Sequence, residues 1–202
     1  MMTLYKHTIR YGMKTDLFCQ YKNGSPMQNT KKPKEIWLNK GLKILKEEGP
    51  SALSIDNLAL QTQKTKGSFY HHFKNRERYI EALMDYYEMK TTMEILHAVN
   101  EETGQAAQLK KLTALVFQIS SRLELVVRAW ALYEPVVKEF QDRIDQKRLA
   151  HLTEIYLSTC SDFSHAQALA FKNYSIYIGM QQLRHLYAEN KFKTLLKNIF
   201  LT

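Results

Sequence analysis

The sequence predicts an all-α fold, and three observations lead to that prediction. The chain has 202 residues, 45% of them hydrophobic, which is enough to bury a core. It contains only 7 Gly and 4 Pro, whereas a protein of many short strands needs more turn residues. After residue 33, apolar side chains recur at three- and four-residue spacing through most of the chain. These features favour helices over strands.

The beginning of the chain differs from the rest. Residues 1–33 follow neither a helical nor an alternating pattern, and Asn23-Gly24-Ser25-Pro26 is a turn or linker signal. We therefore expect residues 1–30 to be a disordered arm or a mis-assigned start, with Met27 as the first residue of the functional chain. The helical remainder divides into a domain over residues 31–90 and a domain over residues 91–202.

Four helices are predicted for the first of these domains. The first spans residues 34–48 and ends at a Gly-Pro pair, which stops a helix. Ser54 is a suitable N-cap for the second helix. The third covers residues 65–75, and the fourth continues past Met93. In the second domain the predicted helices are 105–119, 121–133, 135–159, 164–188 and a short one at 191–200.

The third helix has two faces of different character. At 100° per residue, Phe69 and Phe73 share one apolar face, whereas Lys66, Tyr70 and Lys74 share the opposite one. An ordinary amphipathic surface helix would explain the phenylalanines, but not the hydrogen-bond donors gathered opposite them. Three short helices with such a third member are typical of a helix-turn-helix.

The excess of positive over negative charge lies entirely in the first part of the chain. Residues 1–80 hold 15 Lys and Arg against 6 Asp and Glu, a net charge of +9, whereas residues 81–202 hold 14 of each. A solvated basic tail would explain part of this excess. A basic surface that attracts phosphates explains it equally well.

The run from Lys66 to Arg76 reads Lys-Gly-Ser-Phe-Tyr-His-His-Phe-Lys-Asn-Arg. It resembles the recognition-helix signature of the TetR family of bacterial transcription regulators. The resemblance implies a DNA-binding domain over residues 31–90, with its helix-turn-helix at 54–73, followed by a helical ligand-binding and dimerisation domain over 91–202. Matching residues in the first two helices are Gly41, Ile44, Leu45, Glu47, Gly49, Ser54, Ile55, Leu58 and Ala59.

The resemblance also implies which residues contact double-stranded DNA. Ser54 would cap the second helix and contact a phosphate, and residues 65–68 would enter the major groove. Residues 70–72 would grip the backbone or the base edges, and Arg76 would reach a phosphate. The complete set is Ser54, Lys64, Thr65, Lys66, Gly67, Ser68, Tyr70, His71, His72, Lys74 and Arg76.

Three positions depart from the pattern of the family. Gln63 and Lys64 stand in the turn where a small residue and an apolar one are usual. Either the turn is looser here, or Lys64 provides an extra phosphate contact. Gly41 replaces the usual Ala, which lowers helix propensity by about 1 kcal/mol but permits close packing.

Large soft side chains are frequent in the second domain, and they could either fill a core or line a pocket. Phe117, Trp130, Tyr133 and Tyr174 are the candidates for a pocket that takes a small apolar or aromatic ligand. The full set of such residues is Phe117, Trp130, Tyr133, Tyr156, Phe171, Tyr174, Tyr177 and Met180.

Helices 135–159 and 164–188 are expected to form the homodimer interface, as the resemblance implies. Apolar stripes on them are Ile144, Leu152, Ile155, Tyr156, Ala168, Phe171, Ile178 and Leu186. Glu124 and Arg128 are four residues apart, which predicts a modest surface ion pair. The run Arg128–Ala131, followed by Asp145 and Arg148, is similar to a pattern in one group of TetR regulators.

Other function classes find little support. The histidines and the cysteines Cys19 and Cys160 lack the spacing of a metal site or a catalytic constellation, and no cofactor is predicted. Without a long apolar run or a signal-peptide core, the protein is expected in the cytoplasm and not in a membrane. The resemblance favours a homodimeric repressor released by a small molecule, and the alternative is a constitutive DNA-binding protein or activator without an inducer.

Overall fold

A computed structural model describes residues 33–119 and 121–200, and every regular element among them is a helix. The all-α prediction is therefore confirmed. The expectations for residues 1–30, including a start at Met27, lie outside the described residues. No helix in the described part of the chain is both long and apolar enough to cross a membrane.

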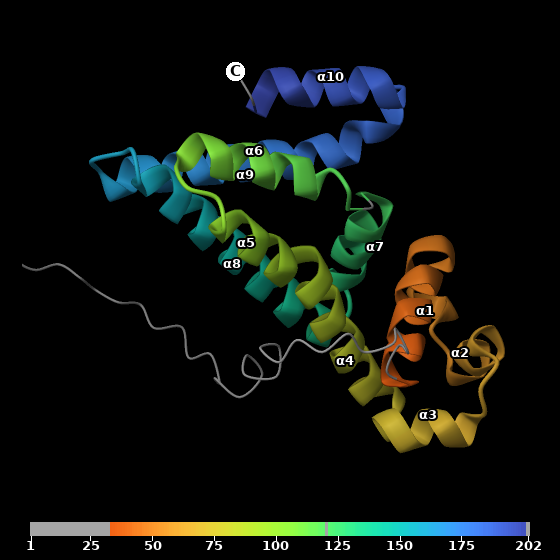
Figure 1. Cartoon of the computed structure of the whole chain (residues 1–202). Coiled ribbons are helices and arrows are strands. Elements are labelled where there is room, and N and C mark those ends of the chain that lie inside the picture. Colours follow the sequence, from red (N-terminus) through yellow and green to blue (C-terminus); the bar gives the residue numbers. More distant parts are fainter. Residues whose placement is uncertain (1–32, 120, 201–202) are drawn as a thin grey trace, which may run out of the picture. The chain divides into compact units, whose positions relative to one another are not determined.

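The helices form two groups, joined by a long helical connection (Figure 1). The first group is α1 (Pro33–Glu48), η3 (Pro50–Ala52), α2 (Ile55–Thr62), α3 (Lys66–Phe73) and α4 (Arg76–Glu88). The second group is η4 (Met89–Met93), α5 (Glu94–Asn100), α6 (Gln105–Val116), α7 (Ser121–Ala131), α8 (Pro135–Leu157), α9 (Phe163–Leu183), η5 (Arg184–Leu186) and α10 (Glu189–Phe200).

An aromatic cluster holds the first group together. The ring of Phe69 in α3 lies 5.5 Å from that of Trp37 in α1, in an edge-on arrangement. Phe73 lies 4.9 Å from Tyr79 of α4. All four rings are buried, and edge-to-face packing of this kind adds to the gain from burial. The apolar face of α3 is therefore fixed inward, and its opposite face points outward.

Side-chain caps set the beginnings of the three short helices. The Ser54 hydroxyl accepts a hydrogen bond from the Asn57 amide, and the Thr65 hydroxyl accepts one from the Ser68 amide, both at 3.2 Å. Asn75 caps α4 in the same way. These caps explain why the helix starts could be located from the sequence.

The turn between α2 and α3 is closed, which answers one of the alternatives raised by its sequence. Gln63 adopts the left-handed conformation with φ 55°, the region that glycine occupies most easily. The Lys64 amide then donates to the Ala59 carbonyl at 3.0 Å. A glutamine therefore makes the same turn as a glycine, at a conformational cost.

The predicted fourth helix does continue past Met93, but not as one regular helix. Between α4 and α5 the chain makes a π-helical turn, η4. Within it the Thr91 hydroxyl donates to the Tyr87 carbonyl at 2.8 Å, and an Arg148 guanidinium N–H donates to the Thr91 carbonyl at 3.3 Å. Both a π-turn and a side chain that bonds to the helix backbone are features at which a helix departs from regular geometry.

In the second group, α8 packs along α9. Residues from α5, α6, α8 and α9 form a second apolar core. The α8 residues Ile144, Leu152 and Ile155, expected in a dimer stripe, are buried within the subunit instead. On α9, Ala168 and Phe171 are exposed. The dimer stripe predicted for α8 therefore serves the core of the subunit, since that face packs on neighbouring helices.

Replacing Gly41 by Ala is expected to destabilise the fold by about 1–3 kcal/mol, because an added Cβ would lie 1.9 Å from the Tyr79 hydroxyl oxygen. That hydroxyl donates to the Trp37 carbonyl at 3.1 Å and cannot move freely. Urea denaturation of the two single variants Gly41→Ala and Tyr79→Phe and of the double variant measures the coupling. The cost of Gly41→Ala should shrink in the Tyr79→Phe background, and strictly additive costs would contradict this account.

Candidate functional site

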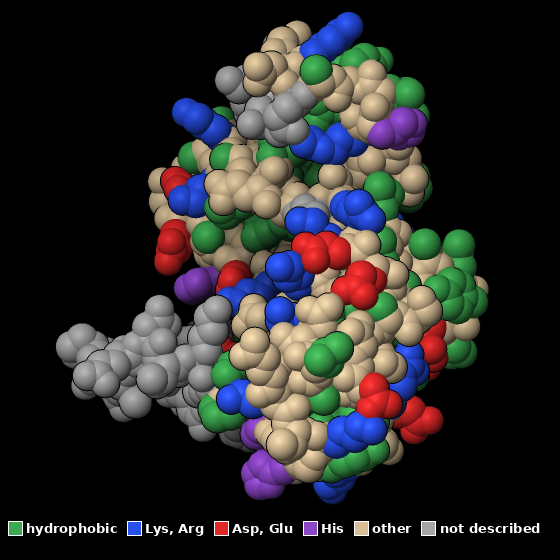
Figure 2. All heavy atoms as spheres, turned by 90° about the vertical axis from the view of Figure 1, so that its right-hand side faces the viewer, with side chains coloured by type: hydrophobic (Ala, Val, Ile, Leu, Met, Phe, Trp, Pro, Cys, Tyr) green, Lys and Arg blue, Asp and Glu red, His purple; other side chains and the backbone are tan. Residues whose placement is uncertain are grey.

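The outward face of α3 carries most of the residues that the sequence assigned to DNA. In Figure 2, histidines and basic side chains gather at the lower end of the view, where α3 lies. Tyr70 is 50% exposed although its ring touches the buried Phe69 edge-on. The exposed residues of this surface are Ser54, Lys64, Thr65, Lys66, Gly67, Tyr70, His71, Lys74 and Arg76, and Ser68 and His72 are partly buried.

Two cations of this surface already have partners within the protein. Lys66 forms an exposed ion pair with Asp56 of α2, and this contact raises the pKa of Lys66. Arg76 donates through Nε to the Leu53 carbonyl at 3.2 Å, which ties the start of α4 to the segment before α2. That bond uses one of five guanidinium N–H groups. The phosphate contact expected of Arg76 stays a prediction.

The pair His71 and His72 sits at the end of α3, with ring centroids 5.2 Å apart. The pKa of His72 is lowered by burial and by the positive charges of His71 and Lys34. The proximity of Lys34 places the start of α1 beside the end of α3. An imidazole donates at least one hydrogen bond in either protonation state, which suits a contact with a phosphate or a base edge.

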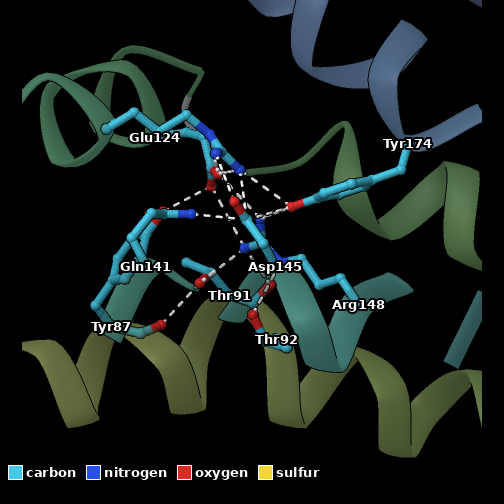
Figure 3. A network of polar contacts seen from close by, with 9 residues as sticks. Tyr87, Thr91, Thr92, Glu124, Gln141, Asp145, Arg148 and Tyr174 are labelled. Atoms are coloured by element: carbon cyan, nitrogen blue, oxygen red, sulfur yellow. Dashed lines mark hydrogen bonds and ion pairs between the residues drawn. The ribbon is translucent and has the colours of Figure 1, made fainter. Parts of the chain in front are cut away.

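A buried polar network lies where α4 meets the second group of helices (Figure 3). At its centre is Glu124 of α7, whose carboxylate receives the Tyr87 hydroxyl at 2.6 Å. Arg128 donates to it through Nε at 3.0 Å, and Arg148 of α8 donates through Nη1 at 2.9 Å. Side chains from α4, α7 and α8 thus meet at one carboxylate.

The second carboxylate of the network is Asp145 of α8. Arg128 binds it with two parallel hydrogen bonds of 2.9 and 2.8 Å, the geometry in which an arginine holds a carboxylate most firmly. Tyr174 of α9 donates to Asp145 at 2.7 Å, and Gln141 donates to it at 2.8 Å. The two acidic and two basic side chains balance in charge.

The prediction of a surface ion pair at Glu124 and Arg128 is wrong, because Glu124 is buried. Burial alone would raise the pKa of its carboxyl, but the charges of Arg148 and Arg128 and the hydrogen bond from Tyr87 lower it to about 2. Both charges lie within the most apolar stretch of the chain, residues 123–133. This apolar sequence context was the signal that could have indicated burial, since a helix on the surface rarely has so few polar residues.

A further charged cluster joins α4 to α8. Glu88 at the end of α4 is buried and receives Arg143 and Lys147 of α8. Burial opposes the ionisation of Glu88, yet these two cations lower its pKa. The end of α4 is therefore held to α8 by ion pairs immediately before the π-helical turn.

A partly open cavity lies beside the network. Its walls are mainly aliphatic, and they come from η4, α5, α6, α8 and α9. Among the pocket candidates, Phe117 and Tyr174 line it. Apolar wall residues are Ile95, Leu96, Leu109, Leu112, Val116, Phe117, Ile119 and Leu152.

The other two pocket candidates lie elsewhere. Trp130 is 1% exposed and belongs to the core that α7 shares with α1 and α4. Tyr133 follows the end of α7 and is 69% exposed. Helical periodicity marked both as apolar, but it could not show which face of α7 meets which neighbour. That depends on how the helices pack.

Several cavity residues escaped the sequence reasoning. Thr91 and Thr92 line the cavity from η4, and His151 lines it from α8. A threonine in a helix is an unremarkable residue, so the sequence offered no signal for the first two. His151 recurs in step with the apolar residues of α8, which was a weak indication of burial.

Sequence comparison relates the first group of helices to known regulators. Residues 38–83 match the model of the bacterial regulatory proteins of the tetR family. The transposon Tn10 TetC protein of Escherichia coli is 36% identical over 55 residues, which make up 27% of this chain. The matched part spans only 28% of that relative.

Solved structures extend the likeness to the second group of helices. A TetR transcriptional regulator from Legionella pneumophila is 15% identical with a TM-score of 0.75, and the match covers 86% of this chain and 97% of that one. A TetR transcription regulator from Haloarcula marismortui is 18% identical with a TM-score of 0.69, covering 82% and 93%. At these identities the likeness shows the fold alone.

Replacing Glu124 by Gln is expected to destabilise the protein by about 3–5 kcal/mol, because two partly buried arginines lose the buried carboxylate that they share. The carboxylate of Glu124 stabilises the fold above about pH 5, and this contribution is lost as the pH falls from the ordinary pKa of 4.5 toward 2. Urea denaturation between pH 7 and pH 3 tests both statements.

The control for this variant is Glu139→Gln, which changes an exposed glutamate of α8. It should alter stability by no more than about 0.5 kcal/mol. The Glu124→Gln variant should also lose part of the acid dependence of the parent protein. An unchanged stability at pH 7 would show that the network contributes nothing to the fold.

Proposed function

Because the chain belongs to the TetR family of bacterial regulatory proteins, we propose that it is a DNA-binding transcriptional regulator of the cytoplasm. In its full form the proposal is a homodimeric repressor that leaves its operator when a small molecule binds. The observation that carries it is the outward face of α3, where hydrogen-bond donors and cations stand opposite a buried aromatic face.

The packing of α3 suits a recognition helix. Its inner rings are fixed against α1 and α4, so its outer side chains are presented on a rigid support. Gly67 is open to solvent and would let the backbone approach the floor of the major groove. Lys64, Lys66 and Lys74 would supply attraction to phosphates that does not depend on sequence.

A dimer would place two copies of α3 on one duplex. Two-fold symmetry then requires an inverted repeat whose half-sites lie about 34–36 Å apart, or a multiple of that distance. The exposed apolar side chains of α9, Phe163 and Phe171 among them, are our candidates for the interface. Selection of binding sites from random duplex DNA would reveal the operator, and a site without an inverted repeat would argue against the dimer.

The cavity supports a response to a ligand. Thr91 and Thr92 line it from the π-helical turn, and this turn continues directly from α4. The opposite end of α4 packs on α3 through Tyr79 and Phe73. A ligand that displaces η4 would therefore move the base of the recognition helix. Couplings of this kind typically amount to about 1–3 kcal/mol.

The second candidate is a constitutive DNA-binding protein or an activator without an inducer, in which the second group of helices only dimerises. The observation in its favour is that direct hydrogen bonds of the polar network already join α4, α7, α8 and α9 to one another. Failure of every bound small molecule to release the DNA would favour this alternative.

Replacing Tyr70 or Lys66 by Ala is expected to weaken operator binding by about 1–2 kcal/mol, or five- to thirtyfold, without unfolding the protein. Both side chains are exposed, so their loss leaves the aromatic core intact. A shift assay at fixed salt measures the affinity. The variant Lys172→Ala, an exposed lysine of α9, is the matched control and should bind as the parent does. Unchanged affinity of both α3 variants would reject this surface.

Replacing Phe171 by Asp is expected to convert the dimer into monomers, because the ring is 63% exposed on α9 and would be buried only in the proposed interface. Sedimentation equilibrium over a range of concentrations measures the assembly. Leu132→Asp, at the exposed end of α7, is the control and should leave it unchanged. A Phe171→Asp variant that remains dimeric would move the interface elsewhere.

A further inference from the structure

The polar end of the cavity has no charged side chain that is free to pair with a ligand. Arg148 is the one Lys, Arg, Asp or Glu side chain that lines the cavity in the described residues. Its guanidinium donates to Glu124 at 2.9 Å, to the Thr92 hydroxyl at 3.0 Å and to the Thr91 hydroxyl at 3.3 Å. Glu124 and Asp145 balance Arg128 and Arg148. An incoming carboxylate would have to displace Glu124 from Arg148, leaving a buried anion with one partner fewer.

Whereas Arg148 is charged and ion-paired, three other titratable side chains of the cavity are neutral. Burial lowers the pKa of His151, which keeps its imidazole uncharged near neutral pH. Burial raises the pKa of Tyr177 and keeps its hydroxyl protonated. Burial also raises the pKa of Tyr174, to about 12. An ionic ligand would therefore lose its hydration in the cavity without gaining a free counter-charge.

Among the described residues, the polar groups of the cavity wall that lack a hydrogen-bond partner include the buried Nε2 of His151 and the Tyr177 hydroxyl. Tyr177 stacks on Tyr174 with ring centroids 6.1 Å apart, both on the α9 wall. The Tyr174 hydroxyl is engaged by Asp145 and Arg128. The Tyr177 hydroxyl, in contrast, makes no hydrogen bond with the groups that the structure describes. A half-buried phenol usually finds an acceptor, so this hydroxyl is available to a ligand.

We propose that the cavity selects an uncharged, mostly apolar ligand whose single polar group accepts a hydrogen bond from the Tyr177 hydroxyl. This inference rests on the proposed function, because it names the class of the inducer. The apolar body of the ligand lies against the aliphatic walls from α5 and α6, and its polar group lies toward α9. The charged network remains intact when the ligand binds.

A second hollow next to the cavity contains a cation, but this cation already has a partner within the protein. A smaller hollow adjoins the cavity, shares Phe117 and Tyr177 with it, and is also lined by Arg184. The Arg184 guanidinium lies 4.8 Å from the centre of the Phe192 ring, on the side of α10. Arg184 therefore gives the cavity no free counter-charge.

The experiment compares three molecules that share one chain: 1-decanol, decanoate and decylammonium. Calorimetric titration of the full-length protein at pH 7 measures each affinity. We expect 1-decanol to bind at least about tenfold more tightly than either ion, because the ions pay for desolvation without a counter-charge. Equal or tighter binding of decanoate or decylammonium would overturn the proposal, and so would the absence of binding by all three.

The role of Tyr177 is tested by Tyr177→Phe, which removes the hydroxyl and keeps the ring. The affinity for 1-decanol should fall by about three- to tenfold, the worth of one neutral hydrogen bond. Tyr133→Phe, which removes an exposed hydroxyl outside the cavity, is the matched control and should bind as the parent does. Unchanged affinity of Tyr177→Phe would overturn the assignment of the polar contact.

A parallel shift assay with the selected DNA separates the two proposals. DNA binding without binding of 1-decanol would overturn the ligand class and leave the regulator intact. Binding of 1-decanol by a protein that binds no duplex would support the cavity and overturn the proposed function. Release of the DNA by 1-decanol, weakened in Tyr177→Phe, is the result expected if both hold.

Discussion

The buried carboxylate of Glu124 is the constraint on which the second group of helices depends. A carboxylate is costly to remove from water, and it remains ionised here because Arg128, Arg148 and Tyr87 surround it. These partners come from α7, α8 and α4, so a single charge sets the relative positions of three helices. Apolar packing would tolerate small sliding movements, whereas hydrogen bonds of this geometry do not.

The network also lies between the cavity and the aromatic cluster that supports α3. On one side, Arg148 and the threonines of η4 close the polar end of the cavity. On the other, α4 runs to the aromatic cluster that supports α3. The π-helical turn lies between them, at the point where the helix is least regular. An event in the cavity can therefore reach the proposed DNA surface through one continuous helical segment.

Local rules were sufficient for the first group of helices. The cap at Ser54 and the spacing of Phe69 and Phe73 are properties of neighbouring residues, and the structure agrees with both. The left-handed conformation of Gln63 was harder to predict, because the φ angle of a polar residue in a turn does not follow from its residue type. The Lys66–Asp56 ion pair joins two helices and could not be expected from helical periodicity.

The sequence by itself determined the all-α class, the approximate position of each helix and the face of α3 that points outward, because these follow from periodicity and capping within short segments. Only the tertiary structure decided that Glu124 is buried, that Trp130 belongs to the core and that Tyr177 faces a cavity without a partner. The physical reason is that burial depends on which helices meet. Residues from α4, α7, α8 and α9, far apart along the chain, share one low-dielectric site only after folding.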